Sequence, residues 1–177
     1  RMSDIKNYHS EEHSLSNGQV LMRNYSFEEA LVIVREMTDN LALDLFEKGL
    51  VTSSLTLWIA YDHRYEHEAS KGTVKLERES NSSKKIIDAV EDLYLRIADR
   101  YTGIRRIEVC ANRVAPESYV QYSLFDDPKQ TDKERHLQEA VLNVKQRYGK
   151  NAIMRGSNLL ECSTYRERNE QIGGHRA

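Results

Sequence analysis

The stretch SFEEALVIVREMTDNLALDLFEKG, residues 26 to 49, predicts a long amphipathic helix around which the rest of the fold can be placed. Ser26, followed three residues later by Glu29, forms the capping-box pattern that marks a helix start. Apolar residues then recur at steps of three and four until Gly49, which predicts the helix end. The apolar stripe consists of Phe27, Ala30, Leu31, Val34, Met37, Leu41 and Leu45. Such a stripe has to be buried against another layer of structure.

Two further segments downstream carry similar helix signals. Ser83 is placed to cap a helix that ends at Gly103, and Asp132 is placed to cap another that ends at Gly149. The first apolar stripe is Ile86, Val90, Leu93, Ile97 and Tyr101, and the second is Leu137, Val141, Val144 and Tyr148. We therefore expect a second helix in the middle of the chain and a third near its end.

Segments between these helices alternate apolar and polar residues with the period of two that is typical of strands. They are residues 55–61, 73–77 and 106–112, with a shorter run at 19–22 before the first helix. The order strand, helix, strand, strand, helix, strand predicts an α+β fold of the split βαβ type. We expect a four-stranded antiparallel sheet with two helices on one face, followed by a C-terminal helix and a tail.

The sheet face that the helices leave open should carry a mixture of hydroxyl, amide, basic and aromatic groups. Its expected members are Thr56, Trp58, Thr73, Lys75, Arg106 and Asn112. A row of basic groups on this face would suit phosphate binding, and it would equally suit an ordinary solvated surface. The spacing of these residues alone leaves both interpretations open.

The charge balance limits how this chain could bind nucleic acid. Its 177 residues include 26 Lys and Arg against 28 Asp and Glu, which gives a net charge of −2. Any such binding must come from a local row of basic groups rather than from overall attraction. No run of apolar residues reaches the roughly 20 needed to span a bilayer. We therefore expect no membrane partner and a cytoplasmic location.

Patterns that could support catalysis or metal binding have simpler explanations. The histidine pairs in HSEEH (9–13) and HRYEH (63–67) have the spacing of zinc-binding HExxH, but both lack glutamate at the second position. The adjacent Asp126 and Asp127 precede Pro128 and are interpreted as a solvated loop. We therefore expect no catalytic residue, no metal site and no cofactor in this chain.

The segment VQYSLFDDP, residues 120 to 128, places Leu124 beside Phe125 just before two aspartates. As the end of a strand, the segment would leave Phe125 on the wrong face of the sheet. An exposed aliphatic and aromatic pair next to a glutamine is instead typical of an anchor for a partner. The pair is therefore either a buried strand end or a hook for another protein, and both interpretations remain open.

Together these segments resemble the little-finger, or polymerase-associated, C-terminal domain of Y-family translesion DNA polymerases, most of all the UmuC-like and DinB-like bacterial members. The resemblance covers residues 13–115 and follows the order HSLSNGQVL, capped helix, VTSSLTLWIAYD, SKGTVKLERES, second helix and GIRRIEVCANRV. QYSLF, at 121–125, is similar to the QLSLF-type peptide by which such polymerases bind the bacterial sliding clamp.

The resemblance implies that the open face holds the DNA backbone near the template-primer junction without reading sequence. The implied phosphate contacts are Ser14, Ser16, Lys71, Thr73, Lys75, Arg105 and Arg106. The implied anchors for the sliding clamp are Gln121, Leu124 and Phe125. Glu108 departs from the family pattern, because a small residue is common at its position, and its charge would face DNA or the sheet rim.

The resemblance also implies a division of the chain and a role for it. The expected segments are a linker or tail at 1–12, the little finger at 13–115, a clamp-binding peptide at 116–128, a helix at 129–149 and a flexible tail at 150–177. The palm, fingers and thumb, with the carboxylates that bind Mg²⁺, have no counterpart in this sequence. We therefore expect a non-catalytic fragment of a lesion-bypass DNA polymerase. The alternative is an RNA-binding or regulatory ferredoxin-like module that stacks bases on Trp58.

Overall fold

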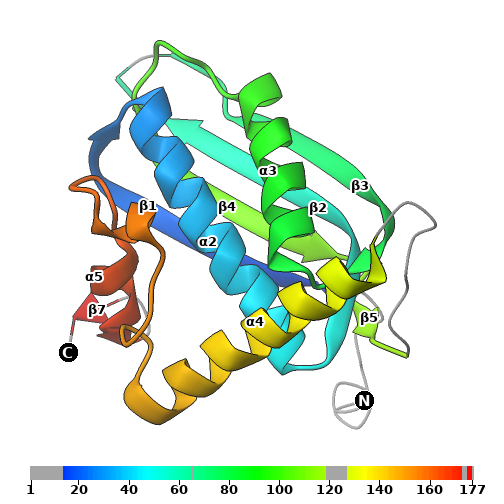
Figure 1. The fold of residues 1–177 in the computed structure, drawn as a ribbon. Helices are drawn as coiled ribbons and strands as arrows, with labels where there is room; N and C mark the ends of the chain where they lie inside the picture. The colour runs from blue at the N-terminus through cyan, green and yellow to red at the C-terminus, as the bar shows by residue number, and fades with distance from the viewer. Residues whose placement is uncertain (1–13, 65, 119–126, 173–174, 177) are drawn as a thin grey trace, which may run out of the picture.

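The computed structural model describes residues 14–64, 66–118, 127–172 and 175–176. An antiparallel sheet lies behind two long helices, and a third helix crosses their ends (Figure 1). The main elements are β1 (Leu15–Tyr25), α2 (Phe27–Glu47), β2 (Leu50–Tyr61), β3 (Ser70–Ser80), α3 (Ser83–Ile97), β4 (Ile104–Asn112) and α4 (Pro128–Tyr148). Shorter elements are β5 (Ala115–Pro116), η1 (Gly156–Leu159), α5 (Tyr165–Asn169), β6 (Gln171–Ile172) and β7 (His175–Arg176). None of the helices in the described part of the chain has both the length and the apolarity to cross a membrane.

The sheet confirms the predicted split βαβ arrangement. Its long strands lie in the order β1-β4-β2-β3, with every neighbouring pair antiparallel. The short β5 pairs with the start of β2 and makes a fifth strand that the sequence did not predict. Since α2 and α3 both follow a strand and return the chain to the same sheet, they lie side by side on one of its faces (Figure 1).

Strand alternation divides the residues of the central strands between the two faces of the sheet. On β2 and β4 the side chains that point toward the helices are fully buried. They are Leu55, Leu57, Ile59, Ile107, Val109 and Ala111, and they pack against the apolar stripes of α2 and α3. The intervening residues point to the opposite face, which no helix in the described part of the chain covers (Figure 1).

The long helix α2 begins and ends as predicted. The side chain of Ser26 accepts a hydrogen bond from the backbone N–H of Glu29, and the Glu29 carboxylate accepts one from the backbone N–H of Ser26. Gly49 follows the helix with a φ of +63°, in the left-handed region that favours glycine. Both ends of α2 therefore depend on residues that the sequence pattern identifies.

The predicted ends of α3 were wrong. Ser82, not Ser83, is the N-cap, because its side chain accepts from the backbone N–H of Lys85. The helix ends at Ile97, well before Gly103. Asp99 then accepts hydrogen bonds from two backbone N–H groups of the following turn, and this competing local structure leaves Tyr101 97% exposed.

The start of α4 was also misplaced. Its N-cap is Asp127, whose side chain accepts from the backbone N–H of Lys129, and Pro128 occupies the first helical position. Asp132 therefore lies inside the helix rather than at its cap. Asp127 is a helix cap and not merely a solvated loop residue. The helix ends at Gly149, as predicted, with a φ of +98°.

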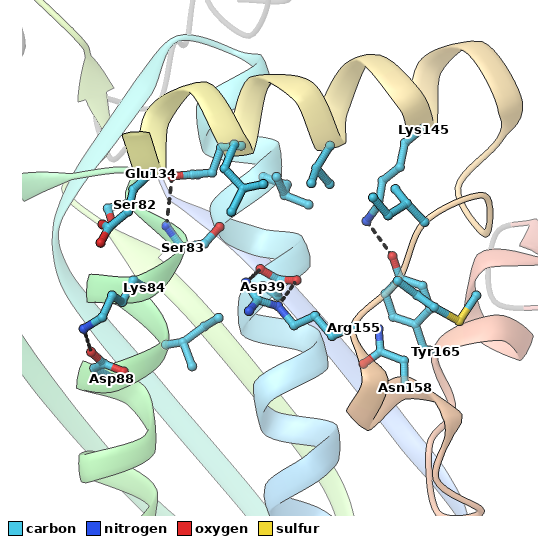
Figure 2. A pocket seen from close by; sticks show the side chains of 17 residues that line it. Asp39, Ser82, Ser83, Lys84, Asp88, Glu134, Lys145, Arg155, Asn158 and Tyr165 are labelled. Carbon is cyan, nitrogen blue, oxygen red and sulfur yellow. Dashed lines mark hydrogen bonds and ion pairs between the residues drawn. The ribbon is translucent and has the colours of Figure 1, made fainter. Parts of the chain in front are cut away.

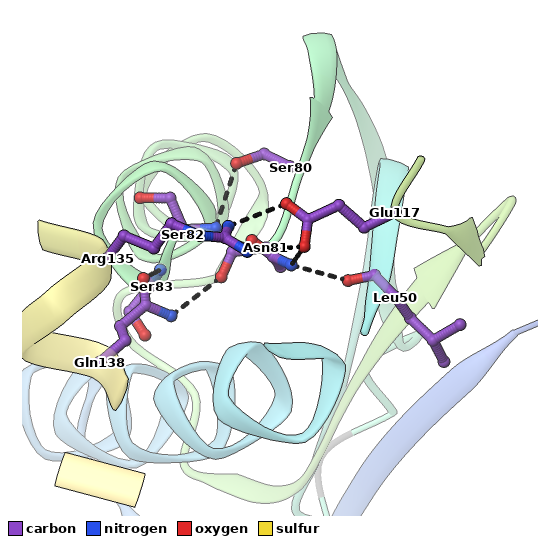
Figure 3. Close-up of polar contacts among 8 residues, drawn as sticks. All are labelled: Leu50, Ser80, Asn81, Ser82, Ser83, Glu117, Arg135 and Gln138. Carbon is purple, nitrogen blue, oxygen red and sulfur yellow. Dashed lines mark hydrogen bonds and ion pairs between the residues drawn. The ribbon is translucent and has the colours of Figure 1, made fainter. Parts of the chain in front are cut away.

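A small polar cluster attaches α4 to the end of the sheet (Figure 3). The Gln138 side chain accepts from the backbone N–H of Ser83 at 3.3 Å and donates to the backbone carbonyl of Asn81 at 3.0 Å. Arg135 donates two hydrogen bonds to the Glu117 carboxylate, at 2.8 and 2.9 Å. Two side chains of one helix therefore fix its position against two different loops.

Residues 150–172, which follow α4, are not the flexible tail that we expected. Residues 150–172 include η1 and α5 and pack beside α2 and β1 (Figure 1). Arg155 donates two hydrogen bonds of 2.9 Å to the Asp39 carboxylate on α2, and Ser163 donates to Glu36. Tyr165 is 1% exposed and its hydroxyl accepts from Lys145. This segment is held by specific polar contacts, which leave no periodic signal in the sequence.

Candidate functional site

A hollow of about 480 Å³ lies on the sheet face that the helices leave uncovered. It is lined by eight residues from β2, β3 and β4, namely Thr56, Trp58, Lys71, Thr73, Arg106, Glu108, Cys110 and Asn112. All the residues predicted for the open face line it except Lys75, which follows Thr73 on the same side of β3. The prediction that these side chains share one face of the sheet, left uncovered by the described helices, is therefore confirmed.

The register of the sheet explains why these side chains meet. Thr56 lies opposite Thr73 on β3 and Cys110 on β4. Trp58 lies opposite Lys71 on β3 and Glu108 on β4. Directly opposed residues share a face of the sheet, so each β2 residue stands at the centre of a cross-strand row.

Hydrogen bonds order the hydroxyl and amide groups of the hollow. The side-chain oxygens of Thr56 and Thr73 are 2.8 Å apart and share a hydrogen bond. Asn112 donates from its side-chain nitrogen to the Thr56 oxygen at 2.9 Å. These short polar side chains therefore form a fixed patch between the flanking cationic groups.

The cationic groups of this face differ in their surroundings. Lys71 and Lys75 are exposed on the edge strand β3, and their side chains form no hydrogen bond or ion pair with any other described residue. Arg105 is half-buried and has none either within the described part of the chain. Arg106 lies 3.6 Å from the Glu108 carboxylate, and its guanidinium stands 5.2 Å from the centre of the Trp58 ring. The Lys71 and Lys75 side chains are thus available to bind an anion on this face, whereas Arg105 does not line the hollow.

The remaining predicted phosphate contacts lie at the margins of this face. Ser16 on β1 pairs with Cys110, so that its exposed side chain is on the open side of the sheet. Ser14 is exposed and precedes β1. Arg105 falls where the register shifts between β4 and β2, and it has no direct partner on β2. The structure therefore gathers Lys71, Thr73 and Arg106 around one hollow and places Ser16 and Lys75 on the same face. Ser14 and Arg105 lie outside the paired rows of this face.

The predicted clamp anchors Gln121, Leu124 and Phe125 lie outside the described residues. The two interpretations of this segment, a buried strand end and a hook for a partner, both remain predictions. Of its surroundings, the structure describes the sheet domain before it and α4 after it.

Two further residues line the hollow: Glu108, whose charge was expected to face DNA or the sheet rim, and Cys110, to which sequence reasoning assigned no role. Glu108 and Cys110 share strand parity with Arg106 and Asn112, and this parity was the signal that could have placed them on the open face. Burial, and secondly the negative charge of Glu108, raise the pKa of the Cys110 thiol. The thiol is therefore not an activated nucleophile.

The described residues offer no site for a metal ion. His63 lies 3.6 Å from Asp62 while His67 bonds to Asp99 at 2.8 Å, so the pair in HRYEH belongs to two separate contacts. No group of three or more His, Cys, Asp or Glu side chains converges anywhere in the described ranges.

A second cavity, of about 510 Å³, lies on the helical side between α2, α3, α4 and the C-terminal segment (Figure 2). Its apolar lining includes Leu43, Ile87 and Val141. The hydrogen-bonded side chains of Asp39 and Arg155 also line the cavity (Figure 2). Ser83 contributes a buried hydroxyl that has no partner among the described residues. With cations and carboxylates mixed around it, this cavity lacks the positive character of the open face.

Residues 12–124 match the impB/mucB/samB family C-terminal domain. The chain belongs to this family. The match confirms the resemblance to the C-terminal little-finger domain of Y-family polymerases. It also extends past the sheet and through most of the QYSLF segment, which ends at Phe125.

This chain is similar to two curated proteins called DNA polymerase IV 2. It is 24% identical over 164 residues to the one from Bacillus subtilis (strain 168), covering 92% of this chain and 39% of that protein. It is 21% identical over 168 residues to the one from Halalkalibacterium halodurans, covering 94% of this chain and 40% of that protein. The chain thus spans well under half the length of these relatives.

The solved structures that this chain matches include the little finger domain of PolIV in its complex with the beta-clamp processivity factor. That domain has a TM-score of 0.45 and 12% identity, covering 64% of this chain and 100% of that chain. The post-insertion binary complex of Dbh DNA polymerase has a TM-score of 0.42 and 15% identity, covering 58% of this chain and 29% of that chain. The family assignment rests on the match over residues 12–124.

Proposed function

We propose that this chain holds the sugar-phosphate backbone of DNA against its open sheet face, as the C-terminal domain of a lesion-bypass DNA polymerase. The observation that carries the proposal is the hollow on this face, where cations and ordered hydroxyls surround a surface that no described element covers. Lys71, Lys75 and Arg105 have no counter-ion among the described residues. Phosphate oxygens would supply the missing partners.

The mode of binding follows from the kinds of group present. Each Lys or Arg that meets a phosphate displaces a condensed counterion, so the affinity should fall steeply as salt rises. Hydroxyls such as those of Ser16 and Thr73 can donate to phosphate oxygens without contacting a base. The role is therefore to position DNA, independently of its sequence, for chemistry performed elsewhere in a longer polymerase.

We also propose that QYSLF binds the bacterial sliding clamp through Gln121, Leu124 and Phe125. The support is the similarity of the segment to clamp-binding peptides and the inclusion of most of it in the family match. A second attachment of this kind would raise the local concentration of the domain at DNA that the clamp encircles. Weak intrinsic affinity for DNA would then suffice.

The experiment that tests DNA binding compares the chain with an Arg105→Ala, Arg106→Ala variant on template-primer duplexes of unrelated sequence. Affinity should fall by a similar factor on every duplex, and the slope of log affinity against log salt should become less steep by about 0.9 for each phosphate that is no longer neutralised. The matched control replaces Arg147 and Lys150, which are exposed at the far end of α4, by alanine. Unchanged binding by the first variant, or equal weakening in both, would show that the open face is misassigned.

The alternative, an RNA-binding module that stacks bases on Trp58, receives less support from the structure. Such sheets use two or three aromatic platforms, whereas Trp58 is the one aromatic among the eight residues that line the hollow. One side of its ring is also approached by the Arg106 guanidinium. Tighter binding to single-stranded RNA than to duplex DNA, abolished in Trp58→Ala, would favour the alternative.

A further inference from the structure

A single carboxylate lies within the cationic open face. Of the eight residues that line the hollow, Glu108 is the one that carries a negative charge. It lies opposite Trp58 on β2 and opposite Gly18 on β1. A Cβ atom built on Gly18 would lie 3.7 Å from Cγ of Glu108, so the glutamate side chain rests directly over a residue that has none. Nothing on β1 at this row covers the carboxylate.

The Glu108 carboxylate acts on the arginine next to it. It stands 3.6 Å from the Arg106 guanidinium, which also lies over the Trp58 ring. The side chains of Arg106 and Glu108 are 51% and 39% exposed. An ion pair this exposed contributes little to the stability of the fold. Its consequence is instead local, because it offsets the charge of the one arginine among the residues that line the hollow.

A phosphate that approached Arg106 would meet both charges at once. It would be attracted to the guanidinium, repelled by the carboxylate a few ångströms away, and required to displace the existing ion pair. Lys71 and Lys75 carry no such neighbour among the described residues. The two sides of the hollow therefore differ, because the lysine that lines it from β3 is unpaired and the arginine that lines it from β4 is paired with a carboxylate.

We propose that Glu108 is a positioning residue that weakens the hold on DNA by keeping Arg106 paired over Trp58. The inference rests on the proposed function, because it names a regulator of the same phosphate-binding surface. A weakened hold allows the domain to release and shift along the backbone, while β3 maintains contact through its lysines. Glu108 thus sets the affinity without contributing a contact of its own.

The direct test replaces Glu108 by glutamine, which keeps the shape of the side chain and removes its charge. Measured by fluorescence anisotropy on a labelled template-primer duplex, Glu108→Gln should bind about three- to tenfold more tightly than the unmodified chain at low salt. The slope of log affinity against log salt should become steeper by about 0.9, because Arg106 gains a phosphate. The matched control is Glu139→Gln, an equally neutralising change at an exposed position on α4.

A double-mutant cycle separates the proposed role from a general relief of repulsion. In the Arg106→Ala background, Glu108→Gln should improve binding by less than half the factor that it produces when Arg106 is present. Equal improvement in both backgrounds would overturn the part of the inference that works through Arg106. The melting temperature of each variant shows that the sheet is folded.

The outcomes also distinguish this inference from the proposed function. If Arg105→Ala with Arg106→Ala weakens binding while Glu108→Gln leaves it unchanged or weaker, the role of Glu108 is refuted and the DNA-binding face stands. If the arginine variant binds as well as the unmodified chain, the face is misassigned and the inference fails with it. Improvement by Glu139→Gln as large as that by Glu108→Gln would reduce the effect to net charge, and this result too would refute it.

Discussion

The C-terminal segment offers the sharpest test of whether residues after α4 belong to the folded domain. Tyr165 is 1% exposed, and its hydroxyl accepts a hydrogen bond from Lys145 on α4. Truncating a buried aromatic residue to alanine commonly costs about 3–5 kcal/mol. Because the ring lies between α4 and the segment, we expect Tyr165→Ala to lower the free energy of unfolding by about 3 kcal/mol.

Two companion variants divide this effect into its causes. Tyr165→Phe keeps the ring and removes the hydroxyl, so it should cost about 1 kcal/mol. Tyr148→Ala makes the same truncation at a site that is 73% exposed, and it should change stability by less than about 0.5 kcal/mol. The ring of Tyr165, rather than its polar contact, would then account for most of the destabilisation.

Urea unfolding monitored by tryptophan fluorescence is the suitable assay. The chain has one tryptophan, and Trp58 lies on the sheet, remote from Tyr165. A shift in its unfolding transition reports that removing the Tyr165 ring destabilises the sheet as well. If Tyr165→Ala leaves the Trp58 transition unchanged, the segment unfolds independently, and the reasoning that makes it part of one cooperative unit is refuted.

Two further predictions concern the clamp peptide and the pH dependence of stability. Leu124→Ala with Phe125→Ala should abolish capture of the chain by immobilised sliding clamp and leave the melting temperature unchanged; a fall of several degrees would show that the pair is core. The Arg23 side chain, and secondly the Ser26 backbone N–H, lower the pKa of Glu29 from 4.5 to about 2. A lowered carboxyl pKa in the folded state stabilises the fold above pH 4.5, and this contribution disappears as pH falls toward 2. The difference in urea midpoint between the unmodified chain and Glu29→Gln should therefore be largest at pH 6 and shrink steadily as pH falls from 4.5 toward 2. A difference as large near pH 2 as at pH 6 would contradict this assignment.

The strand and helix order followed from patterns that act locally. The capping box of Ser26 and Glu29 and the left-handed Gly49 fix both ends of α2 whatever surrounds it. Strand alternation likewise placed Thr56, Thr73 and Asn112 on one face before any pairing was known. These features were predictable because each depends on residues that are close in sequence.

The errors arose where several local signals competed or where contacts joined distant residues. Ser82 and Ser83 are both suitable caps, and the sequence does not distinguish them. In the structure Ser82 caps the helix by accepting from the Lys85 backbone N–H, while the Ser83 backbone N–H donates to Gln138 on α4. The pair formed by Asp39 and Arg155 joins residues 116 positions apart. No periodic pattern records such a contact, and so the packed C-terminal segment was mistaken for a tail.

The candidate site was predictable in outline and not in its balance of charge. Parity alone places Arg106 and Glu108 on the same face, but their separation and the approach of Arg106 to Trp58 depend on side-chain conformation. The absence of a side chain at Gly18 has consequences for Glu108 only once β1 is known to pair with β4. The three-dimensional register was needed to show that this carboxylate lines the hollow beside Arg106 and Trp58.

The most direct test of the account is a map of the surface that DNA contacts. In a two-dimensional amide NMR titration with a template-primer duplex, the largest shifts should occur at Thr56, Lys71, Thr73 and Arg106 and diminish as salt is added. Residues of α2 and α4, on the opposite side of the domain, should be unaffected. Shifts concentrated on those helices, with the open sheet face unchanged at saturating DNA, would contradict the account.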